Sequence, residues 1–378
     1  MTIVVVGAGI IGCALAYELA ARGAAVRVVD SRGAGEGATR ASAGTLAPYI
    51  EGHSAALRTL GVRGLDLFDR FVERVHGDSG EPIEYARAGS LQVALNDDEA
   101  ADLLATASAL AAEGVAHQLL DAEGVRNLEP ALRTLPAALL MPQHGHVSVP
   151  ALMGALHKAA TRFGALWTTA PVTGVRQTGA GAEVMTDDRT FAADAVIVAA
   201  GSWSSHLHTP APPHLRTFAP SHPRTLAPES PVRPIRGQLV HLRLDHQPVS
   251  RVIWGTGCYI VPWRNGSLLV GATVEDVGFD ESVTPAAVRS LAQAAATLLP
   301  AARGARIHDV RVGLRPMTPD GLPAIGRSST MPGVFYATGH YRTGVLLAPL
   351  TAALIADLVL DQREDPALAL VRPDRLGL

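Results

Sequence analysis

The sequence predicts an α/β fold, α+β overall, in which a parallel sheet carries inserted segments of antiparallel sheet. Two observations lead to this class. Residues 3–30 read as a buried strand, a glycine-rich turn, a helix and a second strand, which is typical of a parallel βαβ unit. Residues 238–274 show short apolar runs separated by turn residues, which is typical of antiparallel strands. The 378 residues, 48% of them hydrophobic, suffice for two domains.

The N-terminal half alternates expected strands and helices. Apolar residues at helical spacing predict a helix over 10–22, which Gly23 ends. The same spacing predicts a helix over 54–75, and Asp97 is expected to cap a third helix over 98–112. The remaining expected elements are a helix from Ser148-Val149-Pro150 to about residue 163 and strands at 166–176 and 195–199.

The C-terminal half begins with residues 205–235, whose eight prolines, four histidines and lack of periodicity predict a long loop. We interpret the irregularly spaced histidines, His206, His208, His214 and His222, as part of a solvated loop rather than as a metal site. The later expected elements are β runs at 238–244, 251–254, 258–262 and 267–273 with a turn at Asn265-Gly266, a helix from Thr284-Pro285 to Leu299, a strand over 334–337 and a helix over 345–360.

Composition excludes several classes of protein. The net charge is −3 and no block is rich in Lys or Arg, so we expect no nucleic-acid partner. The only cysteines, Cys13 and Cys258, are too few for a disulfide framework or a cysteine-rich metal site, and we expect no metal. The apolar N-terminus lacks a basic signal region, and the apolar run 344–360 is short for a membrane span. We therefore expect a cytoplasmic protein with no membrane partner.

The first turn carries a dinucleotide fingerprint, Gly7-Ala8-Gly9-Ile10-Ile11-Gly12. Gly7 permits the tight turn, Gly9 lets a pyrophosphate approach the backbone, and Gly12 lets the helix pack against the strand. Asp30 ends the next strand, where an acid accepts hydrogen bonds from ribose hydroxyls. The sequence therefore predicts a Rossmann-type nucleotide-binding unit.

The fingerprint alone does not choose between NAD and FAD, but three later segments favour FAD. The small residues of 40–46 suit a backbone that passes close to a flat ring. The strand over 195–199 runs into a turn with Ala200 and Gly201. The loop 339–344 leads directly into a helix, whose N-terminus would stabilise negative charge on a reduced flavin.

Together with further motifs, these segments resemble the D-amino-acid-oxidase superfamily of flavoproteins, and within it the glycine oxidases. The further motifs are Cys258-Tyr259-Ile260-Val261-Pro262, Gly313-Leu314-Arg315-Pro316, Asp320-Gly321-Leu322-Pro323, Ile325-Gly326-Arg327 and the run 339–349. The resemblance implies non-covalent FAD and oxidation of an amino-acid C–N bond. It also implies a discontinuous FAD-binding domain of residues 1–85, 145–204 and 305–378, and a substrate domain of residues 86–144 and 205–304.

The resemblance assigns the reaction to Arg315 and Arg342, which would meet the substrate carboxylate, and to Tyr259, which would close the pocket. A guanidinium binds a carboxylate by two parallel hydrogen bonds, which Lys cannot copy. Hydride would leave a neutral amine substrate, so positioning rather than a side-chain base would supply most of the acceleration. We expect His340 to contact the flavin rather than act as an acid or base. The expected FAD contacts are Gly7, Gly9, Ile10, Ile11, Gly12, Asp30, Ser31, Ala38, Thr39, Ala43, Gly44, Thr45, Val172, Ala200, Gly201, His340, Tyr341, Arg342, Thr343, Gly344, Val345 and Leu346.

Three positions depart from the glycine-oxidase pattern. Thr45 and Val274 stand where methionines occur in bacterial glycine oxidases, and Gly257 stands where a histidine can occur. All three residues are smaller, which predicts a wider pocket and an N-substituted glycine as substrate, unless Trp263 refills the space. The expected products are glyoxylate with ammonia or an amine, and H2O2 from O2. Some relatives attach flavin through a Cys near the segment of Arg315, and no Cys stands there.

Three alternatives stay open from the sequence. The chain could be a D-amino-acid oxidase or dehydrogenase, whose substrate needs space on the other side of the α-carbon. It could be a flavoprotein that acts on carboxymethylamino groups of tRNA, against which the absence of a basic patch argues. It could also be a Rossmann module without catalysis. The sequence does not identify the N-substituent, the electron acceptor, the pathway (thiamine biosynthesis or specialised metabolism) or a homo-oligomeric state.

Overall fold

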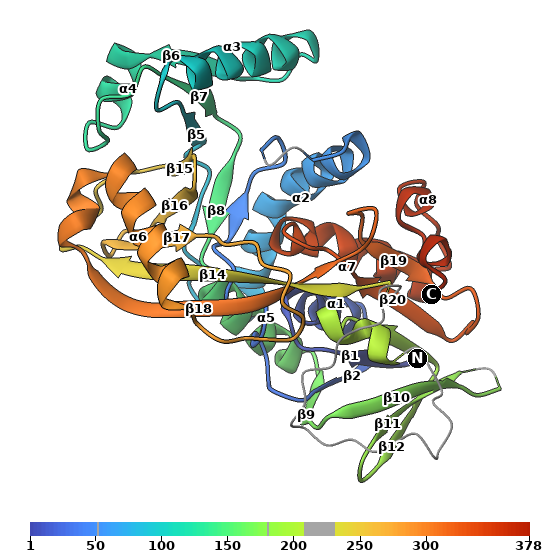
Figure 1. The fold of residues 1–378 in the computed structure, drawn as a ribbon. Coiled ribbons are helices and arrows are strands. Elements are labelled where there is room, and N and C mark those ends of the chain that lie inside the picture. The colour runs from blue at the N-terminus through green and yellow to red at the C-terminus, as the bar shows by residue number, and fades with distance from the viewer. Residues whose placement is uncertain (51–52, 180, 208–230) are drawn as a thin grey trace.

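Two large sheets, one mostly parallel and one mostly antiparallel, organise the chain (Figure 1). The structure is a computed structural model, and it describes residues 1–50, 53–179, 181–207 and 231–378. The parallel sheet carries α1, α2, α5 and α7 on one face, while the antiparallel sheet extends away from it toward α3 and α4. The predicted combination of sheets is confirmed.

The parallel sheet has six strands in the order β19-β20-β13-β1-β2-β9, of which only β19 runs antiparallel. Its strands are β1 (Thr2–Val6), β2 (Ala25–Asp30), β9 (Leu166–Thr169), β13 (Ala195–Val198), β19 (Ala324–Arg327) and β20 (Val334–Thr338). Alternate side chains of each strand enter different cores. Val5 and Ile197 pack with the helices, whereas Val4 and Val196 pack on the opposite face. The strands read as continuous apolar runs because both faces are buried.

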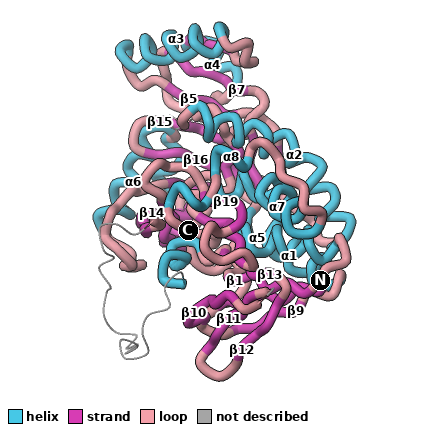
Figure 2. Tube along the Cα trace, turned by 90° about the vertical axis from the view of Figure 1, so that its right-hand side faces the viewer, coloured by secondary structure: helices cyan, strands magenta, loops and turns pink. Residues whose placement is uncertain are grey.

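Four helices cover one face of this sheet, and a small antiparallel sheet covers the other. The helices are α1 (Ile10–Ala21), α2 (Ala55–Ser79), α5 (Val149–Arg162) and α7 (Gly344–Leu360). The small sheet contains β10 (Val172–Gln177), β11 (Ala182–Thr186) and β12 (Thr190–Ala193). Figure 2 shows this small sheet beside β1, β9 and β13, at the end of the molecule opposite α3. The parallel sheet is therefore the middle of three layers.

The second large sheet has eight strands in the order β18-β14-β17-β16-β15-β5-β7-β6. Its strands are β5 (Ser90–Val93), β6 (Gln118–Asp121), β7 (Ala137–Met141), β14 (Arg233–Arg243), β15 (Val252–Gly255), β16 (Cys258–Pro262), β17 (Ser267–Gly271) and β18 (Arg306–Met317). Among them only the pair β15 and β5 is parallel. Helix α6 (Pro285–Leu298) and η3 (Pro300–Gly304) pack on one face of this sheet. The other face, which carries Leu239 and Val261, packs against Ala43.

The remaining elements connect the two sheets or close the ends of the chain. Helices α3 (Asp97–Ala112) and α4 (Ala122–Leu128) lie by β6 and β7. A three-stranded sheet in the order β3-β8-β4 contains β3 (Thr45–Leu46), β4 (Tyr85–Ala86) and β8 (Gly145–Val147). The short elements are η1 (Gly201–Leu207), α8 (Leu368–Val371) and η4 (Pro373–Leu376).

Several expected boundaries were wrong, each for a local reason. The side chain of Asn96, not that of Asp97, caps α3 by accepting from the N–H of Glu99 at 2.9 Å. The expected strand over 166–176 is two strands, β9 and β10, in different sheets. The expected loop over 205–235 overlaps η1 at its start and β14 at its end, and residues 208–230 lie outside the described chain. Strand β18 was not predicted, and it extends the eight-stranded sheet beyond residue 304; the domain boundaries themselves stay a prediction.

Two glycines of α2 predict opposite effects on stability. A Cβ at Gly64 would lie 2.6 Å from the carbonyl oxygen of Leu346 in α7, whereas a Cβ at Gly77 meets nothing within 4 Å. Gly64→Ala should therefore lower the free energy of unfolding by about 1–3 kcal/mol because two backbones must separate. Gly77→Ala should raise it by about 0.5–1 kcal/mol through the helix propensity of Ala. Urea denaturation checks both, and equal effects at the two positions would contradict the close packing of α2 against α7.

Candidate active site

The expected FAD contacts lie in loops at one edge of the parallel sheet. Strands β1, β2, β13 and β20 are parallel, so their carboxyl ends share this edge. The loops that follow them carry Gly7 to Gly12, Asp30 and Ser31, Ala200 and Gly201, and His340 to Leu346. Val172 also lies nearby, because the N–H of Ala170 donates to the carbonyl of Asp30 at 2.9 Å. The structure therefore brings these residues to one region, while their contacts with FAD stay a prediction.

The fingerprint turn has the geometry that its glycines predict. Gly7 has φ +107°, and a Cβ there would lie 2.4 Å from the carbonyl oxygen of Ala199. A Cβ at Gly12 would lie 1.9 Å from the carbonyl oxygen of Gly7. The Asp30 carboxylate accepts from the N–H of Ala8 at 2.8 Å and thereby fixes the turn to the end of β2. Only glycine allows a backbone this close to a ligand at this turn.

Two helices begin at this edge, and neither N-cap residue bonds its helix through a side chain, although Thr39 Oγ1 accepts from the N–H of Ile10 at 3.0 Å. Gly9 precedes α1 and Thr343 precedes α7, and neither helix has an acidic residue in its first turn. The two N-termini are adjacent, since a Cβ at Gly344 would lie 3.9 Å from Ile10 Cγ2. Helix N-termini carry partial positive charge, which suits a pyrophosphate and an electron-rich flavin ring. The residues present therefore fit FAD.

Not every expected contact directs its side chain at a ligand. His340 is buried, and its Nε2 lies 3.0 Å from Thr351 Oγ1 inside α7. Burial lowers the pKa of His340 to about 3, so the ring is neutral and does not exchange protons near neutral pH. Leu346 packs on α2, where a Cβ at Gly61 would lie 3.3 Å from its Cδ2. Val345 and Leu346 also belong to the core, so only their backbone remains for a cofactor.

A cavity of about 590 Å³ lies between these loops and the eight-stranded sheet. Tyr259, Arg315 and Arg342, the three residues assigned to the reaction, all line it. Ala38, Ala43, Thr45 and Tyr341, four of the expected FAD contacts, line the same cavity. The structure therefore brings the expected substrate and cofactor residues to one site.

Three strand glycines make room for this cavity, a role that the sequence analysis assigned to none of them. A Cβ at Gly237 would lie 2.2 Å from Arg315 Nη2, and a Cβ at Gly271 would lie 2.5 Å from Tyr259 Oη. A Cβ at Gly313 would lie 2.8 Å from Ala41 Cβ. Arg315 and Tyr259 therefore lie over glycines of neighbouring strands. Glycine inside an apolar strand is the signal that could have indicated this close approach.

Arg315 is a half-buried cation whose hydrogen-bond partners in the described residues are backbone carbonyls. Its Nη1 donates to the carbonyl of Thr273 at 2.9 Å and to that of Arg236 at 3.4 Å. It forms no ion pair with a carboxylate in the described part of the chain. Arg342 is exposed at the rim, with its guanidinium carbon 5.2 Å from the centroid of the Tyr341 ring. We call the part of the cavity at Arg315 its floor. The floor is therefore a stronger position for an anionic ligand than the rim at Arg342.

Two of the three smaller positions line the cavity, and the third does not. Thr45 and Gly257 lie in its wall, but Val274 is 54% exposed and lies outside it, so the expectation for Val274 was wrong. Val274 follows the end of β17, in a segment whose backbone still pairs with β14 through Glu275 and Arg236. Trp263 does not refill the space, because it packs against His146 with ring centroids 4.9 Å apart.

The far wall of the cavity comes from α3 and was not predicted. Glu99 and Asp102 contribute carboxylates there, and Thr106 lies beside them. Glu99 accepts from Thr256 Oγ1 at 2.9 Å, which joins α3 to the turn between β15 and β16. Trp254 also lines the cavity, and its ring is tilted against that of Tyr259 with ring centroids 4.8 Å apart. The Nε1 of Trp254 is buried without an acceptor in the described residues. The cavity is therefore cationic at its floor and anionic at its far wall.

These features define a flavin-binding oxidoreductase. The model of the family of FAD-dependent oxidoreductases matches residues 2–358. The chain belongs to this family, and its cofactor is FAD. It is 33% identical to the glycine oxidase of Geobacillus kaustophilus over 373 residues, which cover 97% of this chain and 94% of that protein.

Solved structures show the same similarity. The crystal structure of the Geobacillus kaustophilus glycine oxidase matches with a TM-score of 0.86, covering 96% of this chain and 95% of that one. An iminodiacetate oxidase from Chelativorans sp. BNC1 is 27% identical and matches with a TM-score of 0.85 over 98% of each chain. The predicted fold class, enzyme class and cofactor are confirmed. The individual site residues stay predictions.

Two features are absent from the described chain. None of its helices combines the length and apolar character needed to cross a membrane. No group of three or more His, Cys, Asp or Glu in the same residues could hold a metal ion. Of the four histidines expected in the loop, His206 lies in η1 with its ring 5.1 Å from that of Phe279, and the other three lie outside the described chain.

Three buried histidines predict a loss of stability in acid. Burial lowers the pKa of His340 and His144 to about 3 and that of His146 to about 4. In the unfolded chain the same groups titrate near pH 6.5. Below that pH the unfolded state binds more protons, so the stability falls as the pH decreases, by about 1.4 kcal/mol per pH unit for each group until its folded pKa is reached.

Urea denaturation of the wild type and of His146→Gln between about pH 7 and pH 5 measures this dependence. The variant should show a shallower decline than the wild type. His246→Gln, in an exposed turn, is the control and should leave the slope unchanged. Parallel curves for His146→Gln and the wild type would show that His146 does not contribute.

Proposed function

We propose that the enzyme oxidises the glycine carbon of an N-substituted glycine. The net reaction consumes the secondary amine, O2 and water and yields glyoxylate, the free amine and H2O2. When bound, FAD supplies the two-electron acceptor. The observation that carries the proposal is that one cavity joins the expected cofactor contacts, the Arg315 guanidinium and, beyond them, a wall from α3.

Arg315 is the group that would hold the substrate carboxylate. Its Nη1 is occupied by carbonyls, and the rest of the fork has no protein partner in the described chain. A carboxylate would gain charge-assisted hydrogen bonds there. The hydroxyl of Tyr259 lies over the neighbouring strand and would add a further hydrogen bond without adding charge. These contacts would fix the α-carbon of the substrate against the cofactor loops.

The wall of the cavity favours a substrate larger than glycine. Thr45 and Gly257 leave space in the wall, and Trp263 packs elsewhere. The similar iminodiacetate oxidase is named for a glycine with a second carboxymethyl group on its nitrogen. Oxidation of an N-substituted glycine on this fold therefore has support besides the cavity.

The far wall favours a polar N-substituent. Its carboxylates, Glu99 and Asp102, repel an anionic group and attract a hydrogen-bond donor or a cation. An N-substituent with a hydroxyl or amino group matches these carboxylates. We propose such a group in preference to a second carboxylate.

The flavin is proposed to be non-covalent, because neither cysteine is reactive. Burial raises the pKa of the Cys258 thiol to about 12 and raises that of the Cys13 thiol still further. The thiolate is the nucleophilic form of cysteine. Neither side chain therefore provides a ready nucleophile for a flavin bond.

Arg315→Lys should lower kcat/KM roughly 30- to 1000-fold. The lysine keeps the charge but loses the bidentate geometry, and one or two charge-assisted hydrogen bonds cost on the order of 2–4 kcal/mol. Steady-state kinetics of the folded, FAD-loaded variant measure the change. An unchanged kcat/KM would remove Arg315 from the carboxylate site.

The wild type should prefer N-substituted glycines over glycine. Two methylenes of added contact correspond to about 1.6 kcal/mol, or roughly fifteenfold in binding. The panel is glycine, sarcosine, N-propylglycine, N-(2-hydroxyethyl)glycine, N-(2-aminoethyl)glycine and iminodiacetate, with anaerobic flavin bleaching as the readout.

Filling the cavity should reverse this preference. Thr45→Met should depress activity on the larger substrates and leave sarcosine nearly unaffected, while Val274→Met, outside the cavity, is the matched control. Gly257 is a poor position for this test because its φ of +89° strains any side chain. If glycine is oxidised at least as well as every N-substituted analogue, the enlarged-pocket argument fails.

A further inference from the structure

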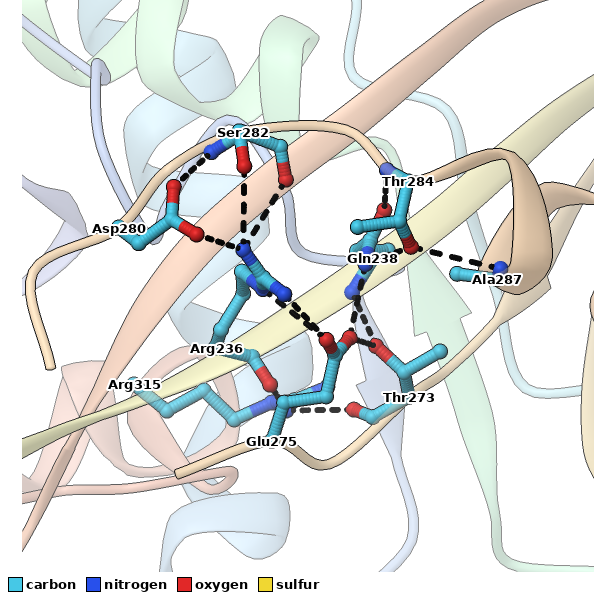
Figure 3. A network of polar contacts seen from close by, with 9 residues as sticks. All are labelled: Arg236, Gln238, Thr273, Glu275, Asp280, Ser282, Thr284, Ala287 and Arg315. Atoms are coloured by element: carbon cyan, nitrogen blue, oxygen red, sulfur yellow. Dashed lines mark hydrogen bonds and ion pairs between the residues drawn. The ribbon is translucent and has the colours of Figure 1, made fainter. Parts of the chain in front are cut away.

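A buried ion-pair network lies next to the floor of the cavity (Figure 3). Arg236 in β14 is only 4% exposed, and its guanidinium binds Glu275 and Asp280. Both acids belong to the segment that leads from β17 to α6. The network therefore fastens this segment across β14, beside Arg315.

Glu275 is the centre of the network. Its carboxylate accepts from Arg236 Nε at 3.1 Å and from Arg236 Nη2, from Gln238 Nε2 at 2.8 Å and from Thr273 Oγ1 at 2.5 Å. Burial raises the pKa of Glu275, but the hydrogen bonds from Thr273, Arg236 and Gln238 outweigh burial and lower it overall. The carboxylate is therefore ionised, with its lone pairs occupied by protein donors.

The same segment supplies the carbonyls that hold Arg315. The N–H of Arg236 donates to the carbonyl of Glu275 at 2.8 Å, and the N–H of Glu275 donates to the carbonyl of Arg236 at 3.0 Å. Arg315 Nη1 donates to the carbonyls of Thr273 and Arg236, as Figure 3 shows. A displacement of Glu275 would move both acceptors of Arg315.

We propose that Glu275 is a positioning residue, which orients the Arg315 guanidinium toward the substrate carboxylate. The proposal rests on the proposed function of Arg315 as the carboxylate site. It also explains why Glu275 and Asp280 pair with Arg236, the neighbour of Arg315, and not with Arg315 itself. A direct carboxylate partner would orient Arg315 but would compete with the substrate, whereas carbonyls orient it and leave its charge uncompensated. Arg236 balances the charge of Glu275, so that this carboxylate does not pair with Arg315.

A purely structural role would have a different signature. The network also fixes the start of α6, since Gln238 binds both Thr284, which caps that helix, and Glu275. If the network only stabilised the sheet, loss of Glu275 would lower Tm and leave ligand affinity unchanged. If Glu275 positions Arg315, loss of Glu275 weakens the binding of carboxylates specifically.

The test is Glu275→Gln in the FAD-loaded enzyme, with acetate as the carboxylate probe. Calorimetric titration should show Kd for acetate rising roughly 10- to 100-fold, because misplacement of a binding group by about 1 Å has effects of this size. Substrate KM should rise by a similar factor, with a smaller change in kcat. Sulfite, which adds to flavin and carries no carboxylate, should bind as in the wild type.

Asp276→Asn is the matched control. Asp276 is the next residue and forms an ion pair with Arg233 at 2.8 Å, but both side chains are about half exposed. This variant should leave the Kd for acetate unchanged. Thr273→Val is the second variant in case Glu275→Gln does not fold, because it removes one hydrogen bond to Glu275 and keeps the carbonyl; it should raise the Kd for acetate several-fold.

The double variant Glu275→Gln/Arg315→Lys separates this proposal from the proposed function. If Glu275 acts through Arg315, the double variant should bind acetate no more weakly than Arg315→Lys alone. Unchanged acetate affinity in both Glu275→Gln and Thr273→Val would overturn the positioning role. Unchanged acetate affinity in Arg315→Lys would instead overturn the carboxylate site itself.

Discussion

The active-site cavity depends on glycines of the eight-stranded sheet, which leave room for the side chains of Arg315 and Tyr259 and for the loop of Ala41. Gly237, Gly271 and Gly313 lie in three strands of that sheet, and each would place a Cβ within 3 Å of a site residue. Glycine weakens a strand, because it packs no side chain and loses more backbone entropy on folding than other residues. The apolar core between this sheet and α6 offsets that loss on the other face. The sheet is thus rigid on one face and open on the other.

The charges near the cavity are divided between two tasks. Arg236 is buried among acids and stabilises the segment around Glu275, whereas Arg315 donates to carbonyls and to no carboxylate within the described part of the chain. Burying an unpaired cation is costly, and a half-buried position beside carbonyl dipoles reduces that cost without neutralising the charge. Arg236 in β14 and Arg315 in β18 belong to neighbouring strands and lie in close contact. Of the two, it is Arg315 that remains available for an anionic ligand.

The sequence predicted local features well and nonlocal ones poorly. The strand, turn and helix of residues 2–30 were predicted correctly because each is specified by neighbouring residues. Strand β18 was missed because it lies at a sheet edge and carries charged residues such as Arg306 and Asp309 among its apolar ones. The α3 wall was missed because no local pattern states which helix faces a distant pocket. The side chain of Val274 was wrongly expected in the cavity because the resemblance to glycine oxidases matches positions in the sequence. The direction of that side chain depends on where β17 ends.

The single parallel pair of the eight-stranded sheet, β5 with β15, joins two segments that are distant along the chain. Ser90 to Gln92 pair with Val252 to Trp254, so the two strands meet only after a loop of more than a hundred residues has closed. Such contacts carry a high entropic cost and form late during folding. Gln92 and Trp254 both line the cavity. The substrate pocket is therefore completed only when residues far apart along the chain have met.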